Sequence, residues 1–78
     1  MPKVIVYSTA TCPWCAKVKE FLKENKIKFT NKDVGEDSAA AKEMIIKSNQ
    51  RGVPVIDIDG KIIVGFDEDG LKSALGLK

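Results

Sequence analysis

The sequence predicts an α/β fold in which three helices cover a mixed four-stranded sheet, with the elements in the order βαβαββα. Three observations carry this prediction. Short runs of β-branched residues alternate with segments that have helical periodicity. An Asp-Gly pair joins the last two apolar runs, as is typical of a β-hairpin. The 78 residues are enough for one domain, which we expect to span residues 1–78.

The first predicted strand covers Lys3–Ser8, with the sequence KVIVYS. Both of its alternating faces are apolar, since Val4 and Val6 lie on one face and Ile5 and Tyr7 on the other. A strand that is buried on both sides has this pattern.

The next predicted element is a helix that begins at Pro13. Proline is well tolerated there because the first helical residue has no partner for its N–H within the helix. Apolar side chains then recur at helical spacing while charged residues occupy the other side. Asn25 marks the expected end of the helix. The apolar positions are Trp14, Val18, Phe21 and Leu22.

A weaker strand is expected over residues 29–34, where polar side chains interrupt the apolar ones. A second helix follows, capped by Asp37 or Ser38 and favoured by three alanines. We expect its inner face to comprise Ala41, Met44, Ile45 and Ser48.

Two further strands lie in the segment VPVIDIDGKIIVGF, joined at Asp59-Gly60. Asp67 is expected to cap a short last helix that ends at Gly76. The first β-α-β unit requires parallel strands with a right-handed crossover, whereas the closing hairpin is antiparallel. Helices should therefore cover both faces of the sheet. The inner residues of the last helix are predicted to be Leu71, Ala74 and Leu75.

Composition excludes several classes of function. Basic and acidic residues are interleaved and leave a net charge of +2, so no basic stripe indicates a nucleic-acid partner. The apolar runs are far shorter than the ~20 residues that span a bilayer, which excludes a membrane segment. No signal-peptide pattern opens the chain. We therefore expect a cytoplasmic protein.

The chemistry of the chain is concentrated in the segment TCPWC, which holds its only two cysteines, Cys12 and Cys15. They fall where the first strand passes into the first helix. The unpaired N–H groups and partial positive charge of a helix N-terminus favour a thiolate. Cys12, at the helix entrance, is therefore the predicted nucleophile. Cys15 lies one turn further, within disulfide reach and more buried, so it is suited to attack a mixed disulfide on Cys12.

Other interpretations of the pair are weaker. A structural disulfide across so short a loop would add little stability. A zinc site within one chain needs three or four ligands, and the chain has no histidine and no further cysteine, so we predict no metal site. An iron–sulfur cluster shared by two chains and completed by external thiols stays open, as do two ordinary buried cysteines. Redox cycling is the favoured interpretation.

A second feature is Val53-Pro54, at the head of the third strand. The proline either starts an edge strand or forms a cis peptide bond. A cis bond would turn the N–H and C=O of Val53 outward, beside the sulfurs. An extended substrate could then pair with them as an added strand. Spacing alone does not separate these two interpretations.

The segments TCPWC, GVPV and GFDEDGL resemble the glutaredoxin branch of the thioredoxin superfamily, and the resemblance covers essentially the whole chain. It implies a thioredoxin-like fold with a cis Pro54. It also implies dithiol–disulfide exchange, with Cys12 attacking and Cys15 resolving. The expected substrates are disulfide-bearing or glutathionylated proteins. We expect a monomer without a tightly bound cofactor, for which glutathione is a co-substrate.

The chain departs from the family pattern at several positions. Trp14 replaces the usual tyrosine and is expected to be partly exposed beside the sulfurs. Thr9 stands where glutathione-using members often carry lysine. Arg51 is then a candidate partner for one glutathione carboxylate, unless it is a solvated loop charge. The backbone N–H groups of Asp67 and Glu68 are candidates for the other carboxylate, unless Asp67 serves only as a helix cap.

These departures leave the electron donor open. The segments GFD and NQRGVP also resemble small glutaredoxin-like proteins that act as thioredoxins do. Some of these reduce ribonucleotide reductase with electrons from thioredoxin reductase. Glutathione and a flavoprotein reductase are therefore both candidate donors.

Overall fold

The computed structural model describes residues 3–77, and its elements follow the predicted order. The weak strand predicted over residues 29–34 is present but is one residue shorter at each end. Among the described residues, no helix has the length and apolar character needed to cross a membrane. The elements are β1 (Val4–Ser8), α1 (Pro13–Glu24), β2 (Thr30–Asp33), α2 (Ser38–Ser48), β3 (Val55–Ile58), β4 (Lys61–Val64) and α3 (Glu68–Leu75).

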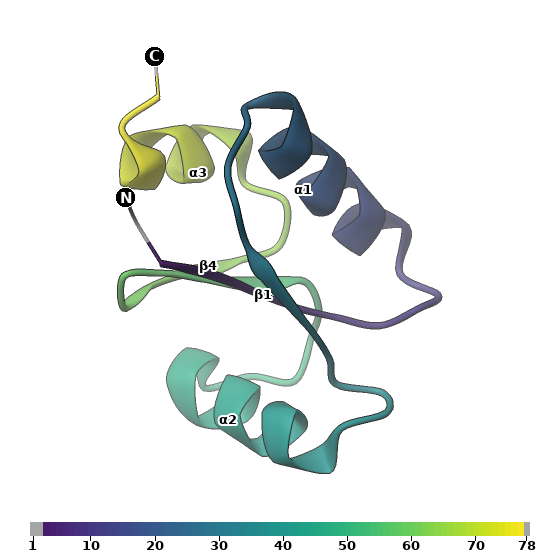
Figure 1. Ribbon diagram of the computed structural model, residues 1–78. Helices are drawn as coiled ribbons and strands as arrows, with labels where there is room; N and C mark the ends of the chain where they lie inside the picture. The colour runs from purple at the N-terminus through teal and green to yellow at the C-terminus, as the bar shows by residue number, and fades with distance from the viewer. Residues whose placement is uncertain (1–2, 78) are drawn as a thin grey trace.

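The four strands form one sheet in the order β2-β1-β3-β4. Strand β1 runs parallel to β2 and antiparallel to β3, and β3 and β4 form the predicted antiparallel hairpin. Helices α1 and α3 cover one face of the sheet and α2 covers the other (Figure 1). The predicted fold class and the parallel and antiparallel pairings are confirmed.

Strand β1 is buried along its whole length, as its two apolar faces predict. Val4 and Val6 pack into the larger core, which α1 and α3 share with the sheet. Ile5 and Tyr7 pack into the smaller core beneath α2, together with Met44. The central strand thus fixes the position of α1, whose N-terminus lies just beyond the strand's last residue.

The predicted inner face of α2 was partly wrong. Ala40 and Met44 are its buried residues, whereas Ala41 is only half-buried. Ala40 lies four residues before Met44 and Ala41 lies three before it, and both spacings keep a side chain on the same side of a helix. Periodicity therefore cannot separate these two alanines. The predicted cap is confirmed, since the Asp37 carboxylate accepts a hydrogen bond from the Ala40 N–H at 3.1 Å. Ile45 and Ser48 are half-buried, and Ile45 packs against the smaller core as predicted.

A polar network joins α2 to three strands. The Tyr7 hydroxyl, on β1, donates to the Glu43 carboxylate of α2. Lys47 donates to the Tyr7 hydroxyl at 2.8 Å and to the Asp57 carboxylate of β3 at 2.7 Å. Lys32 of β2 lies 3.2 Å from Glu43. These contacts hold α2 over the sheet on the side opposite α1.

The network shifts the acid–base behaviour of its members. Hydrogen bonds from Tyr7 and then from Lys32 lower the pKa of Glu43 to about 2. The hydrogen bond to Asp57 raises the pKa of Lys47. Burial, together with the hydrogen bond to Glu43, raises the pKa of Tyr7. The charged form of Glu43 is thus favoured by folding.

We predict that the free energy of unfolding falls as the pH drops from about 4.5 toward 2, and that Glu43→Gln reduces this acid sensitivity. The pKa of Glu43 lies at about 2 in the folded protein, below its ordinary 4.5, so the stability it contributes is complete above the ordinary value and is lost as the carboxylate is protonated. Urea unfolding at a series of pH values measures this. Glu36→Gln is the control, because within residues 3–77 Glu36 has no ion-pair partner. Equal acid sensitivity in the two variants would contradict the prediction.

Candidate active site

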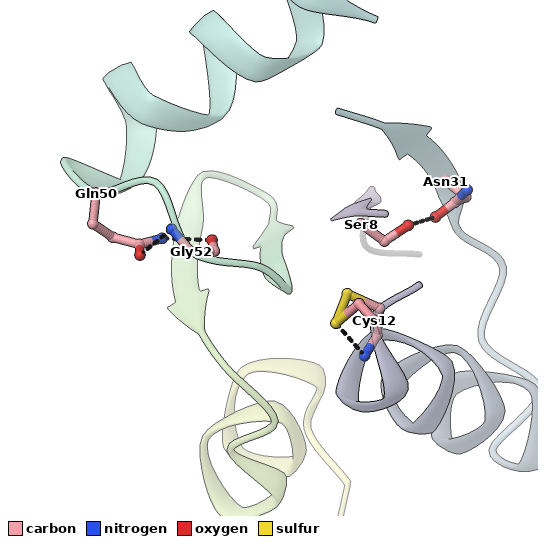
Figure 2. The surroundings of a disulfide bond; sticks show 6 residues. Ser8, Cys12, Asn31, Gln50 and Gly52 are labelled. Carbon is pink, nitrogen blue, oxygen red and sulfur yellow. Dashed lines mark hydrogen bonds between the residues drawn. A yellow bond between two sulfur atoms is a disulfide. The ribbon is translucent and has the colours of Figure 1, made fainter. Parts of the chain in front are cut away.

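Cys12 is the N-cap residue of α1 and adopts an extended backbone conformation. Its Sγ accepts a hydrogen bond from the Cys15 N–H at 3.1 Å (Figure 2). The first turn of α1 contains no acidic side chain. One backbone donor at the start of the helix is therefore directed at the sulfur, where it stabilises negative charge together with the helix dipole.

Cys15 lies one helical turn beyond Cys12, and the two form a disulfide with their Cα atoms 5.2 Å apart. Cys15 is completely buried, whereas Cys12 is partly exposed. The predicted difference in burial is confirmed. A substrate approaching from solvent can reach the sulfur of Cys12 before that of Cys15.

The Val53-Pro54 peptide bond is cis, as the family resemblance implied. Pro54 is buried and lines a cavity of about 250 Å³ with Trp14, Val53, Gly65 and Phe66, which we call the Trp14–Phe66 cavity. The segment before β3 therefore meets the start of α1 at a common depression. Trp14, which lines it, stands between the two cysteines in the sequence.

The backbone of Val53 is available at the edge of this cavity. The ladder between β3 and β4 extends to Pro54, whose carbonyl accepts from the Gly65 N–H at 2.8 Å. Within residues 3–77, neither the N–H nor the carbonyl of Val53 bonds to another backbone group. An extended peptide can pair with groups of this kind.

Trp14 is 55% exposed, which confirms the prediction of partial exposure. Its ring centroid lies 6.3 Å from that of Phe66, and the Nζ of Lys17 lies 4.8 Å from the centroid of the Trp14 ring. Phe66 also meets Phe21 edge-on, with ring centroids 6.0 Å apart. The sequence analysis assigned no role to Phe66. The position of Phe66 in the sequence, between the fourth strand and the helix cap Asp67, was the available indication that it lies near the site.

A buried hydroxyl near the sulfurs also escaped the sequence analysis. Ser8, the last residue of β1, is 1% exposed and donates to the side-chain oxygen of Asn31 at 2.6 Å. Figure 2 shows this pair in the surroundings of the disulfide. In the sequence, Ser8 was distinguished only as a small polar residue at the end of a strand that is predicted to be fully buried. The pair makes one side of the site polar.

Arg51 lies in the loop before β3 and is exposed. The Gln50 side chain holds this loop, since it accepts from the Gly52 N–H at 2.6 Å and donates to the Gly52 carbonyl at 2.9 Å (Figure 2). Arg51 makes no hydrogen bond or ion pair within residues 3–77 and does not line the Trp14–Phe66 cavity. Its role in binding therefore stays a prediction.

Asp67 is the N-cap of α3, and its carboxylate accepts from the Gly70 N–H at 3.0 Å. Asp67 and Glu68 are both exposed, and the first turn of α3 is acidic. The proposed anion-binding N–H groups thus lie beside several carboxylates. Across the described part of the chain, no three acidic or sulfur side chains gather into a set of metal ligands.

Comparison with known proteins gives consistent results. The Glutaredoxin family model matches residues 4–63. The chain is 54% identical over 63 residues to a glutaredoxin-like 8.6 kDa protein in the rubredoxin operon of Clostridium pasteurianum, covering 81% of this chain and 84% of that one. It is 34% identical over 68 residues to glutaredoxin 3 of Escherichia coli K12, covering 87% and 82%. A crystal structure of a mutant of the thioredoxin-like protein BC3987 superposes over the full length of both chains, with a TM-score of 0.92 and 35% identity.

We predict that Cys12 of the reduced protein is alkylated well before Cys15 at neutral pH. Cys12 is partly exposed and its thiolate is favoured by the helix N-terminus, whereas Cys15 is fully buried. Short pulses of iodoacetamide followed by peptide mass spectrometry measure the order. Both cysteines should react at similar rates in denatured protein. Earlier modification of Cys15 in the folded protein would reverse the assignment.

Proposed function

The chain belongs to the glutaredoxin family, and we propose that it is a thiol–disulfide oxidoreductase that reduces protein disulfides or glutathionylated thiols through the Cys12–Cys15 dithiol. One observation carries the proposal. The Cys12 sulfur caps α1 at the surface while Cys15 is buried one turn behind it. The pair therefore combines an accessible nucleophile with a protected second thiol.

The reaction has two exchange steps. The Cys12 thiolate attacks one sulfur of the substrate disulfide, whose S–S bond breaks, and the departing sulfur takes up a proton. Cys15 then loses its proton and attacks the sulfur of Cys12, which forms the internal disulfide and releases the second substrate thiol. The substrate gains two electrons and two protons, and the dithiol loses them.

The geometry supports each step. The hydrogen bond from the Cys15 N–H to the Cys12 sulfur stabilises the attacking thiolate. The Cα separation of 5.2 Å lies within the range for a disulfide, so the second step needs no large movement of the backbone. The free N–H and carbonyl of Val53 would hold the substrate in an extended conformation beside Pro54.

We predict that Cys15→Ser traps a mixed disulfide between Cys12 and a protein substrate, because the second exchange step is lost. This variant should still remove glutathione from small thiols, since a second glutathione can resolve the intermediate. Non-reducing electrophoresis and intact-mass measurement detect the adduct. Cys12→Ser is the matched control and should form no adduct and show no exchange activity. Full activity in Cys12→Ser would refute the proposed roles.

We further propose that glutathione serves as electron donor, although weakly. Glutathione is the family's co-substrate, but Thr9 stands where a lysine would meet one of its carboxylates. A hydrogen bond to a charged group is worth roughly 1.5–3 kcal/mol, or about ten- to a hundredfold in affinity. Arg51 and the N–H groups of Asp67 and Glu68 would recover part of this loss. The protein would act in the cytoplasm as a monomer without a bound cofactor.

We predict that Arg51→Ala lowers glutathione-dependent activity through a higher KM for the glutathionylated substrate, with kcat little changed. The reason is that Arg51 would contact the bound carboxylate and not the reacting sulfurs. A coupled assay with glutathione reductase and NADPH measures both constants. Lys42→Ala, which removes an exposed charge on α2, is the control. Unchanged kinetics would remove Arg51 from the site.

The same assay separates the two donors. Absence of glutathione-dependent turnover, with rapid reduction by thioredoxin reductase, would place the chain with the redoxins that serve ribonucleotide reductase. A visible absorption band in protein purified without oxygen would instead favour a carrier of iron–sulfur clusters.

A further inference from the structure

We infer that the Trp14–Phe66 cavity forms a first groove that continues along α1 into a second, acidic groove. Together the two grooves select substrate segments that carry a positive charge. The preferred substrate would be an extended peptide that has an apolar side chain next to the disulfide cysteine and a lysine or arginine further along. This inference rests on the proposed disulfide exchange at Cys12.

The two grooves share Phe66 as a lining residue. A cavity of about 280 Å³ is lined by Lys17, Glu20, Phe21, Glu24, Phe66 and Glu68. Phe66 also lines the cavity that contains Trp14 and Pro54. The rings of Trp14, Phe66 and Phe21 follow one another at centroid separations of 6.3 and 6.0 Å. An aromatic surface therefore extends from beside the cysteines to the middle of α1.

The charges of the second groove favour a cation. Three of its lining residues are glutamates, and one is a lysine. Lys17 lies at the end near the cysteines, over the Trp14 ring. Lys72 lies 3.3 Å from Glu68 and offsets that carboxylate. Within residues 3–77, Glu20 and Glu24 have no ion-pair partner, so they can receive a positive charge from a ligand.

The length of the groove indicates a peptide as its occupant. Helix α1 rises about 1.5 Å per residue, so Glu20 and Glu24 lie roughly 12 and 18 Å along the axis from Cys12. An extended chain advances about 3.3 Å per residue, which places the complementary cation about four to six residues from the substrate cysteine. Glutathione is a tripeptide with two carboxylates. It is too short for this reach and has the wrong charge.

The test uses the reduced full-length protein in single-turnover reactions. Each peptide carries one cysteine, joined by a disulfide to neutral 2-mercaptoethanol and followed by leucine. A lysine, glutamine or glutamate stands four residues from the cysteine, on the N-terminal side in one set and on the C-terminal side in another. Acid quench and chromatography give the second-order rate constants. Hydroxyethyl disulfide is the substrate without a peptide.

In one of the two sets, the lysine peptide should react about five- to tenfold faster than the glutamate peptide at low salt, and high salt should remove the difference. Glu20→Gln and Glu24→Gln should each reduce this ratio. Glu36→Gln, an exposed carboxylate outside both grooves, should leave the ratio unchanged. This set of results would support the inference.

Three results would overturn it. Equal rates for all peptides, with rapid reduction of hydroxyethyl disulfide, would refute the cationic preference and leave the proposed function intact. Failure to reduce either the peptides or hydroxyethyl disulfide would refute the proposed function itself and the inference with it. A dimer in sedimentation that Glu20→Gln dissociates would show that a second copy of the chain occupies the groove.

Discussion

The hydrogen bond from the Cys15 N–H to the Cys12 sulfur is the contact on which the proposed chemistry depends. It exists because a cysteine occupies the N-cap of α1, a position where serine, threonine or aspartate usually satisfies the helix's free donors. The rest of the fold holds this helix end in place. Buried β1 leads into it through the short loop 9–12, and Val18 and Leu22 anchor α1 against the sheet.

The two faces of the sheet have different roles, one in holding α2 and the other in the proposed binding of substrate. The face beneath α2 carries a network of polar and charged side chains, in which Lys47 donates hydrogen bonds to both Tyr7 and Asp57. The opposite face bears α1 and α3 and the proposed substrate grooves. At the redox site itself, the Cys12 sulfur accepts one backbone N–H, and the polar Ser8–Asn31 pair lies in the surroundings of the disulfide (Figure 2).

The sequence predicted what local patterns encode. Strand runs, helix caps and the Asp-Gly hairpin fixed the order of elements, and the position of Cys12 between a strand and Pro13 predicted its place at a helix N-terminus. Features that depend on distant residues were missed. The contact of Phe66 with Trp14 joins residues 52 positions apart in the chain. Likewise, Ser8 meets Asn31 only because β1 and β2 pair in one particular register.

The ionisation of Cys12 in the reduced protein tests the central claim most directly. The ultraviolet absorbance of thiolates, measured at neutral pH, reports how many cysteines are charged. The account predicts one thiolate in the wild type and in Cys15→Ser, and none in Cys12→Ser, because the sulfur of Cys12 caps the helix N-terminus and accepts the Cys15 N–H there. Two protonated thiols in the wild type, or a thiolate that persists in Cys12→Ser, would contradict it.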